Sequence, residues 1–201
     1  MSGQQFVDMV VESDVDAAAA RKILASCQLS VAREFGKHGK EWVLKNASRY
    51  SLAAEVSPYF LLVDQDDDAC APSTLKKAGS VRSRLLVFRV ATRSIESWLM
   101  ADAEALADFL AVSPAHIPPD TDAITDPKAV LVGIASISRR RAIREGMVPR
   151  AESGRKVGAA YETMLIEFCA KHYDPMRAAP RSRSLQRSIG RLQELEAELS
   201  R

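Results

Sequence analysis

The sequence has few cysteines, few histidines and no long apolar run, and each scarcity excludes a class of protein. Its three cysteines, Cys27, Cys70 and Cys169, are too few and too widely spaced for a disulfide framework or a paired-cysteine zinc site. The three histidines are also too scattered to predict a zinc site. The longest apolar runs have the length of a strand, and no basic segment followed by a long hydrophobic one opens the chain. We therefore expect a cytoplasmic protein with no membrane segment.

The composition favours one domain with a sizeable core, because 47% of the 201 residues are hydrophobic. The small net charge of +2 hides an asymmetry between two parts of the chain. Residues 1–138 carry 14 Lys and Arg against 18 Asp and Glu, whereas residues 139–201 carry 14 against 8. An acidic part beside a basic part suits a metal-dependent enzyme that acts on a phosphate polyanion. It also suits an ordinary soluble protein with arginine-rich helix faces, and charge alone favours the ordinary case.

Apolar runs alternate with helix-like segments through the first half of the chain, which is typical of repeated strand–helix units. Helix-start signals agree, since Ser13 and Asp14 precede an alanine-rich stretch and Asp126 precedes Pro127. We therefore predict an α/β, Rossmann-like fold with a mostly parallel sheet of about four strands flanked by helices. The expected strands cover residues 6–11, 29–35, 59–64 and 84–90.

The basic residues 139–201 are predicted to form a helical extension of the α/β core of residues 1–138. An amphipathic helix close to the end of the chain has an apolar stripe, and most of its arginines lie off that stripe. The helix would pack on the domain or on a partner, and the extension is not expected to be an independent domain. The stripe consists of Leu185, Ile189, Leu192, Leu195 and Leu199.

The most informative stretch is the apolar run 59–64, which leads directly into a cluster of carboxylates. Asp64 ends the expected strand, and Asp66, Asp67 and Asp68 follow within four positions. Parallel sheets place ligand chemistry at the carboxyl ends of their strands. If the extended conformation continues to Asp66, Asp64 and Asp66 project from the same side and repel each other unless a cation lies between them. We favour a divalent-metal site over a solvated acidic turn that caps the next helix.

Two more carboxylates follow expected strands. Glu12 comes directly after the first strand and Glu96 shortly after the fourth, so each could join the aspartate cluster. Each could equally be a first-turn glutamate that the helix dipole favours, and the residues alone leave both interpretations open. Arg155 and Lys156, in an expected loop, are candidate phosphate contacts.

Two familiar acidic motifs do not fit, and a third fits only in part. An EF-hand loop that starts at Asp64 would place Ala69 where glycine is needed and Leu75 where a bidentate glutamate is needed. A Walker B aspartate requires a phosphate-binding GxxxxGK[ST] loop, which the sequence lacks. A haloacid-dehalogenase phosphatase stays possible, although that class carries its DxD after the first strand, followed by a small or β-branched residue. Here Asp67 takes that place and a whole strand–helix unit comes earlier.

A glutamate after the first strand and DxD after a later one resemble the Toprim domain of topoisomerases, primases and overcoming-lysogenization-defect nucleases. The chain resembles more closely a bacterial Toprim-like family of unknown function that is often encoded beside AAA-type ATPases. The resemblance touches nearly the full length. Its matching stretches are Val11-Glu12, residues 62–72 (LVDQDDDACAP), residues 88–102 (FRVATRSIESWLMAD), residues 153–158 (SGRKVG) and residues 182–192.

The resemblance implies a Toprim-like sheet in which Glu12 acts as general acid or base and Asp64 and Asp66 hold Mg²⁺ or Mn²⁺. Glu12 would be a metal ligand or the general base, and Asp68 and Glu96 would support this site or hold a second metal. The sequence departs from the family at Ser13, where Toprim domains usually have glycine. A Cβ atom there could limit how closely a phosphate approaches the backbone.

Two functions from different classes follow. The first is a metal-dependent nuclease that cleaves phosphodiester bonds in nucleic acid, with an AAA-type ATPase as partner in a defence-type system. The second is a non-catalytic regulatory or binding subunit that docks such an ATPase through its helical C-terminal part. We favour the enzyme.

Overall fold

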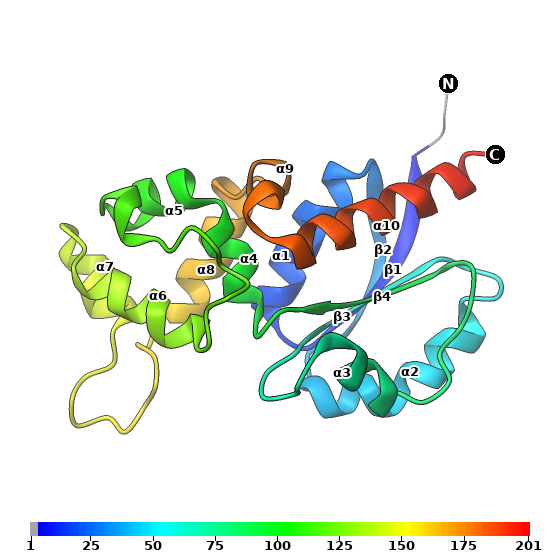
Figure 1. Cartoon of the computed structure of the whole chain (residues 1–201), viewed down its shortest axis with the longest axis horizontal. Helices are drawn as coiled ribbons and strands as arrows, with labels where there is room; N and C mark the ends of the chain where they lie inside the picture. Colours follow the sequence, from blue (N-terminus) through cyan, green and yellow to red (C-terminus); the bar gives the residue numbers. More distant parts are fainter. Residues whose placement is uncertain (1–3) are drawn as a thin grey trace.

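The structure is a computed structural model that describes residues 4–201. At its centre lies a four-stranded sheet in which all pairings are parallel and the strand order is β2-β1-β3-β4 (Figure 1). The α/β, Rossmann-like fold class predicted from the sequence is therefore confirmed. The strands are β1 Gln5–Val11, β2 Leu29–Gly36, β3 Tyr59–Asp64 and β4 Leu86–Ala91.

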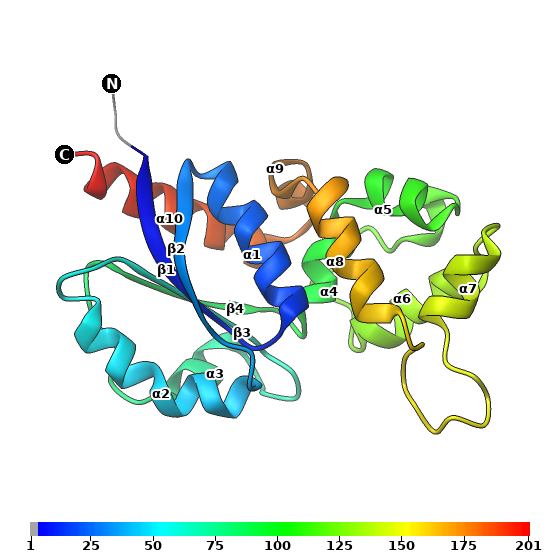
Figure 2. The same cartoon turned by 180° about the vertical axis from the view of Figure 1, so that it is seen from behind.

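Helices cover both faces of the sheet and continue beyond its carboxyl edge. The bounds are α1 Asp14–Ser26, α2 Lys40–Ala53, α3 Ala71–Lys77, α4 Ile95–Ala101, α5 Ala103–Leu110, α6 Pro127–Ser136, α7 Arg141–Met147, α8 Tyr161–Lys171, α9 Pro175–Ala178 and α10 Arg183–Leu199, with 3₁₀ turns Pro114–His116 and Ala179–Arg181. Helices α1 and α10 lie on one face, and α2 and α3 lie on the other (Figures 1 and 2). Helices α4 to α8 form a lobe beyond the carboxyl ends of the strands.

Strand β3 is buried along its whole length because both of its faces are covered. Phe60 and Leu62 belong to the core on the α1 side, whereas Leu61 and Val63 belong to a smaller core on the α2 side. This explains why the strand reads as a continuous apolar run and not as an alternating one. Its last residue, Asp64, is also buried, with 9% of its surface exposed.

The basic C-terminal part shares its core with the rest of the chain. Helix α8 packs on α1, and α10 packs against β4. The apolar stripe predicted for the last helix is turned inward, and four of its five residues are buried, with Leu199 half-buried. The buried side chains are Leu185, Ile189, Leu192 and Leu195.

The backbone between Asp64 and Asp66 is not extended, in contrast to the condition under which the two carboxylates would project from the same side. Strand β3 ends at Asp64, and Asp66 has a left-handed backbone with φ of 52°. The extended conformation therefore does not continue to Asp66, and the strand alternation does not relate the two carboxylates. The turn is fixed by Arg93, whose carbonyl accepts the Asp66 N–H at 2.7 Å and whose guanidinium donates to the Asp66 carbonyl at 3.2 Å.

Within residues 4–201, none of the helices combines the length and the apolar character that crossing a membrane requires.

Candidate active site

A small polar cavity of about 210 Å³ lies at the carboxyl edge of the sheet, between the strand ends and the helical lobe. Its lining comes from the ends of β1 and β3, the first turns of α1, α4, α6 and α8, and the loops between them. Carboxylates dominate the polar part of this lining. The lining residues are Glu12, Ser13, Val15, Asp16, Gly39, Asp64, Asp66, Ile95, Glu96, Lys128, Val157, Tyr161 and Glu162.

Glu12 and Asp64 are held together by a direct hydrogen bond. The Glu12 carboxylate accepts the backbone N–H of Asp64 at 2.5 Å, which ties the end of β1 to the end of β3. Burial raises the pKa of Glu12 from 4.5 to about 8, and the nearby carboxylates of Asp16 and Asp66 add to the shift. Burial also holds the pKa of Asp64 well above its usual range, followed by repulsion from Asp16, Glu12 and Glu96. Both groups therefore strongly favour the protonated form when no cation is near.

Asp16 and Glu96 complete the acidic lining from two different helices. Asp16, in the first turn of α1, is 2% exposed, and burial raises its pKa to about 6. Glu96, in the first turn of α4, is 3% exposed and accepts the Tyr161 hydroxyl at 3.2 Å. Among the described residues, the only cation in the lining is Lys128, whose ammonium group lies 3.6 Å from the Glu96 carboxylate. One lysine thus faces several buried carboxylates.

Three carboxylate oxygens around the cavity are buried without a hydrogen-bond partner among the described residues. They are Asp64 Oδ1, Asp16 Oδ1 and Glu96 Oε2. Buried polar atoms are normally paired, because an unpaired one loses its hydration without compensation. Water, a proton or a cation would each satisfy oxygens of this kind.

Ser13 has a structural role that glycine could not supply. Its backbone is extended, with φ of −143°, so the position does not require glycine. The Ser13 hydroxyl accepts the Asp16 N–H as the N-cap of α1 and donates to Asp16 Oδ2 at 2.5 Å. Ser13 therefore orients Asp16 and leaves Asp16 Oδ1 as its unpaired oxygen.

The structure brings together four of the five predicted metal-site residues, Glu12, Asp64, Asp66 and Glu96, in the lining of this cavity. Asp66 lies at the rim, with 53% of its side chain exposed, and its carboxylate is 3.3 Å from the Lys40 ammonium group. The fifth predicted metal-site residue, Asp68, does not line the cavity.

Asp68 is neutralised by two lysines outside the cavity lining. Its carboxylate contacts Lys40 at 2.9 Å and Lys77 at 2.5 Å, and it accepts the Thr74 hydroxyl at 2.8 Å. The bonds from Lys77, Lys40 and Thr74 lower the pKa of Asp68. Asp68 therefore anchors the turn after β3 to α2 and α3.

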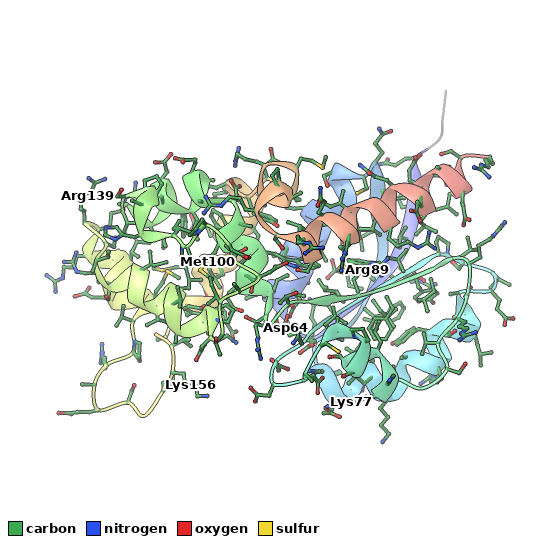
Figure 3. The ribbon with its side chains drawn as sticks, in the orientation of Figure 1. Asp64, Lys77, Arg89, Met100, Arg139 and Lys156 are labelled. Carbon is green, nitrogen blue, oxygen red and sulfur yellow. The ribbon has the colours of Figure 1, made fainter. Side chains whose placement is uncertain are left out.

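The two predicted phosphate contacts lie outside the cavity lining. Arg155 and Lys156 are exposed in the loop that leads into α8, and the next residue, Val157, lines the cavity. Figure 3 shows Lys156 on this loop, on the side of the helical lobe, at a distance from Asp64.

Asp16, Lys128 and Tyr161 line the cavity, yet sequence reasoning did not identify them as site residues. Asp16 reads as a dipole-favoured residue at a helix start, and Tyr161 reads as part of an apolar stripe. Lys128 follows the Asp126-Pro127 helix-start signal and has no motif of its own. The position of all three in the first turn of a helix is the one signal that they share.

The donor set suits a hard cation. Within residues 4–201, no three His, Cys, Asp or Glu side chains are grouped closely enough to hold a metal ion by themselves. Mg²⁺ does not require such a cage, because it commonly takes one or two carboxylates and completes its shell with water and substrate phosphate. The unpaired oxygens of Asp64, Asp16 and Glu96 are ligands of the type that Mg²⁺ prefers.

Comparison of the chain with protein-family models, with curated proteins and with solved structures finds no match. The resemblance to the Toprim domain therefore stays a prediction from the sequence.

Proposed function

We propose that this chain is a Toprim-like, Mg²⁺- or Mn²⁺-dependent phosphodiesterase that acts on nucleic acid. The supporting observation is the set of unpaired, buried carboxylate oxygens around the cavity at the carboxyl edge of a parallel sheet. In open α/β folds this edge is where ligands bind. The excess of carboxylates over cations in the lining favours a bound cation, and a phosphate diester is a substrate that a bound divalent cation would attract.

Asp64 would be the principal ligand, because its Oδ1 is buried and unpaired. Asp16 Oδ1 and Glu96 Oε2 would bind directly or through water, and Asp66 would contribute from the rim. When bound, the cation would polarise the scissile phosphate and lower the pKa of a bound water.

Glu12 would move the proton in this reaction. Its carboxylate is fixed by the Asp64 N–H through Oε1, which leaves Oε2 available for proton exchange. A group with a pKa of about 8 is well matched to acid–base work near neutral pH. Glu12 would act on one side of the phosphate, either as the general base that takes a proton from the attacking water or as the general acid that protonates the leaving oxygen.

The cations near the cavity would hold the substrate. Lys128 is half-exposed, so its ammonium group can turn from Glu96 toward a phosphate at the cavity mouth. Arg155 and Lys156 would contact neighbouring phosphates, since their loop leads into the cavity at Val157. Such contacts add affinity that depends on salt and not on base sequence.

An AAA-type ATPase partner remains a prediction, and so does the alternative of a non-catalytic docking subunit. The apolar stripe of α10 is buried against the chain's own core, so it does not offer a free docking face. Deletion of residues 182–201 would expose that core and destabilise the protein, so it does not test docking cleanly. The two functions are better separated by the activity of a cavity variant.

A nicking assay on supercoiled plasmid tests the enzyme. Wild-type protein with Mg²⁺ or Mn²⁺ should nick the plasmid, and Asp64→Asn should lower the rate by about a hundredfold or more, because the buried cation ligand loses its charge. Asp67→Asn is the matched control, since Asp67 is exposed and lies outside the cavity lining. Equal nicking by wild type and Asp64→Asn, or none by either with both metals, would reject this function.

A second prediction separates binding of the cation from binding of the substrate. Lys128→Gln should bind Mg²⁺ about as tightly as wild type or more tightly, because a charge that repels the cation is removed. The same variant should nick more slowly, since one phosphate contact is lost. Calorimetric Mg²⁺ titration and the plasmid assay measure the two effects, and a Lys128→Gln protein with weaker Mg²⁺ binding would contradict this role.

A further inference from the structure

A second region of the molecule carries a different kind of site, along the outer edge of the sheet. Strand β4 pairs with β3 on one side only, and no other strand of the described chain pairs with its free side. Helices α10 and α3 flank this edge from the two faces of the sheet (Figure 1). Two adjoining hollows of about 940 and 530 Å³ follow the edge and share the residues Pro72, Leu75, Phe88 and Arg89. Together we call them the β4 groove.

The floor of the β4 groove offers backbone hydrogen-bonding groups. The carbonyls of Leu85 and Ala91 accept from Tyr59 and Gln65, so the odd-numbered residues of this strand face β3. Because the direction alternates along a strand, the N–H and C=O groups of Phe88 and Val90 face the free side. On that side the Phe88 carbonyl accepts a hydrogen bond from Arg89 Nη1 at 3.3 Å, which an added strand would replace. An exposed edge of this kind is a template for one more strand, and proteins normally protect such edges.

The walls of the groove are strongly basic. Its cationic lining residues are Lys76, Arg82, Arg84, Arg89, Arg183, Arg187 and Arg191, against the two acids Asp120 and Asp122. Asp122 is already used, because it accepts hydrogen bonds from Ser182 and Ser184 at the start of α10. Two of the arginines are paired with acids of α10, Arg191 with Glu194 and Arg84 with Glu198 at 3.8 Å. The other five cations have no acidic partner among the described residues, so the occupant that complements these walls is acidic.

Among the described residues, Arg89 lacks both a hydrogen-bond acceptor for one of its nitrogens and an ion-pair partner. Its Nε is buried and has no hydrogen-bond partner among the described residues. Figure 3 places Arg89 between β4 and α10, where burial and the nearby charge of Arg191 lower its pKa. A carboxylate beside Arg89 would supply both the missing acceptor and the missing charge.

The spacing of the arginines along α10 matches the spacing of side chains on one face of a strand. Arg183, Arg187 and Arg191 are four residues apart on α10, which separates them by about 6 Å along the helix axis. Side chains on one face of a strand repeat every about 6.7 Å. Alternate residues of a strand added beside β4 would thus meet successive arginines. The other face of that strand would turn toward Pro72 and Leu75 on α3, which are apolar.

We propose that the β4 groove binds an extended acidic segment of a partner protein, which joins the sheet as a strand beside β4. Its sequence would alternate acidic residues, facing α10, with apolar residues, facing α3. This site is independent of the carboxylate cavity and of any catalysis there.

A single-stranded nucleic acid would also be attracted to these arginines, but the groove suits a peptide better. Non-specific single-strand sites combine cations with aromatic side chains on which successive bases stack. Within residues 4–201, Phe88 is the only aromatic residue in the lining of the two hollows. The backbone groups of the free edge pair with a peptide backbone, whereas a base or phosphate would leave most of them unmatched.

The test uses the whole protein and a fluorescein-labelled octapeptide of alternating glutamate and valine, in EDTA at low salt. Fluorescence anisotropy should detect binding, and Arg187→Glu with Arg191→Glu should weaken it by roughly tenfold or more. Arg49→Glu is the matched control, because Arg49 is exposed on α2 and lies outside the groove. Addition of the peptide should also slow hydrogen exchange at the Phe88 and Val90 amides.

Two further probes decide between strand addition and simple charge attraction. A peptide of the same sequence with N-methyl groups on alternate residues should bind much more weakly, because it loses the donors that pair with β4. A short oligo(dT) strand should bind more weakly than the acidic peptide. Undetectable binding of the alternating peptide, equal binding of its N-methylated form, or tighter binding of oligo(dT) would overturn the proposal.

Discussion

The metal-free protein should lose about 3 kcal/mol of unfolding free energy as the pH rises from about 5 to about 8. The reason is the pKa of Glu12, which burial raises from 4.5 to about 8. A raised carboxyl pKa means that the folded state holds the proton more tightly than the unfolded state. Its contribution is therefore fully present below about 4.5 and is lost as the pH passes about 8. The raised pKa values of Asp16 and Asp64 act in the same direction.

Urea denaturation in EDTA across this pH range measures the effect. Glu12→Gln should flatten the profile, because glutamine cannot ionise, and should be more stable than wild type at pH 8. A wild-type stability that is constant or rises over this range would show that these carboxylates are not destabilised by burial.

Mg²⁺ should restore the unfolding free energy that the metal-free protein loses at high pH, because it binds the ionised carboxylates and displaces their protons. At about a hundred times its dissociation constant, a ligand of the folded state adds roughly 2.7 kcal/mol of stability. The apparent affinity for Mg²⁺ should rise with pH up to about 8, the pKa of Glu12. Asp64→Asn should remove most of the Mg²⁺ stabilisation, whereas Asp67→Asn should keep it.

The second large effect concerns an ion pair between the buried Asp102 and the half-exposed Arg177. Asp102, between α4 and α5, has no exposed surface and accepts two hydrogen bonds from the Arg177 guanidinium, at 2.5 and 2.7 Å. It also accepts the Asp174 N–H at 2.8 Å, so it joins these helices to α9. Arg177→Met should destabilise the protein by about 2–3 kcal/mol, because the buried Asp102 carboxylate loses its cation while solvent already screens the half-exposed guanidinium.

The control for this variant is Arg141→Met. The Arg141–Glu145 pair is a surface ion pair, with 81% of the arginine side chain exposed, so its loss should cost about 1 kcal/mol or less. Adding Asp102→Asn to Arg177→Met should recover part of the lost stability, since no charge then stays buried. Similar unfolding midpoints in urea for the two arginine variants would contradict the importance of the pair that Arg177 forms with Asp102.

Most of the secondary structure could be predicted because its signals are local. The apolar run before Asp64 has the length of a strand, and the Asp126-Pro127 pair marks the start of α6. Strand ends also marked Glu12 and Glu96 as candidate neighbours of Asp64, since parallel strands end at one edge, and all three line the cavity. The turn at Asp66 could not be predicted, because its left-handed backbone depends on bonds to Arg93 in the neighbouring loop.

The sequence alone determined the parallel α/β sheet and the carboxylates at its edge, because burial of strands and the position of acids after them are periodic, local properties. Only the tertiary structure decided which charges meet. The packing of α1, α6 and α8 places Asp16, Lys128 and Tyr161 in the cavity lining. The fold of the turn after β3 places the Asp68 carboxylate in ion pairs with Lys40 and Lys77. These contacts join residues far apart in the chain, so their distances depend on how the helices pack and not on sequence spacing.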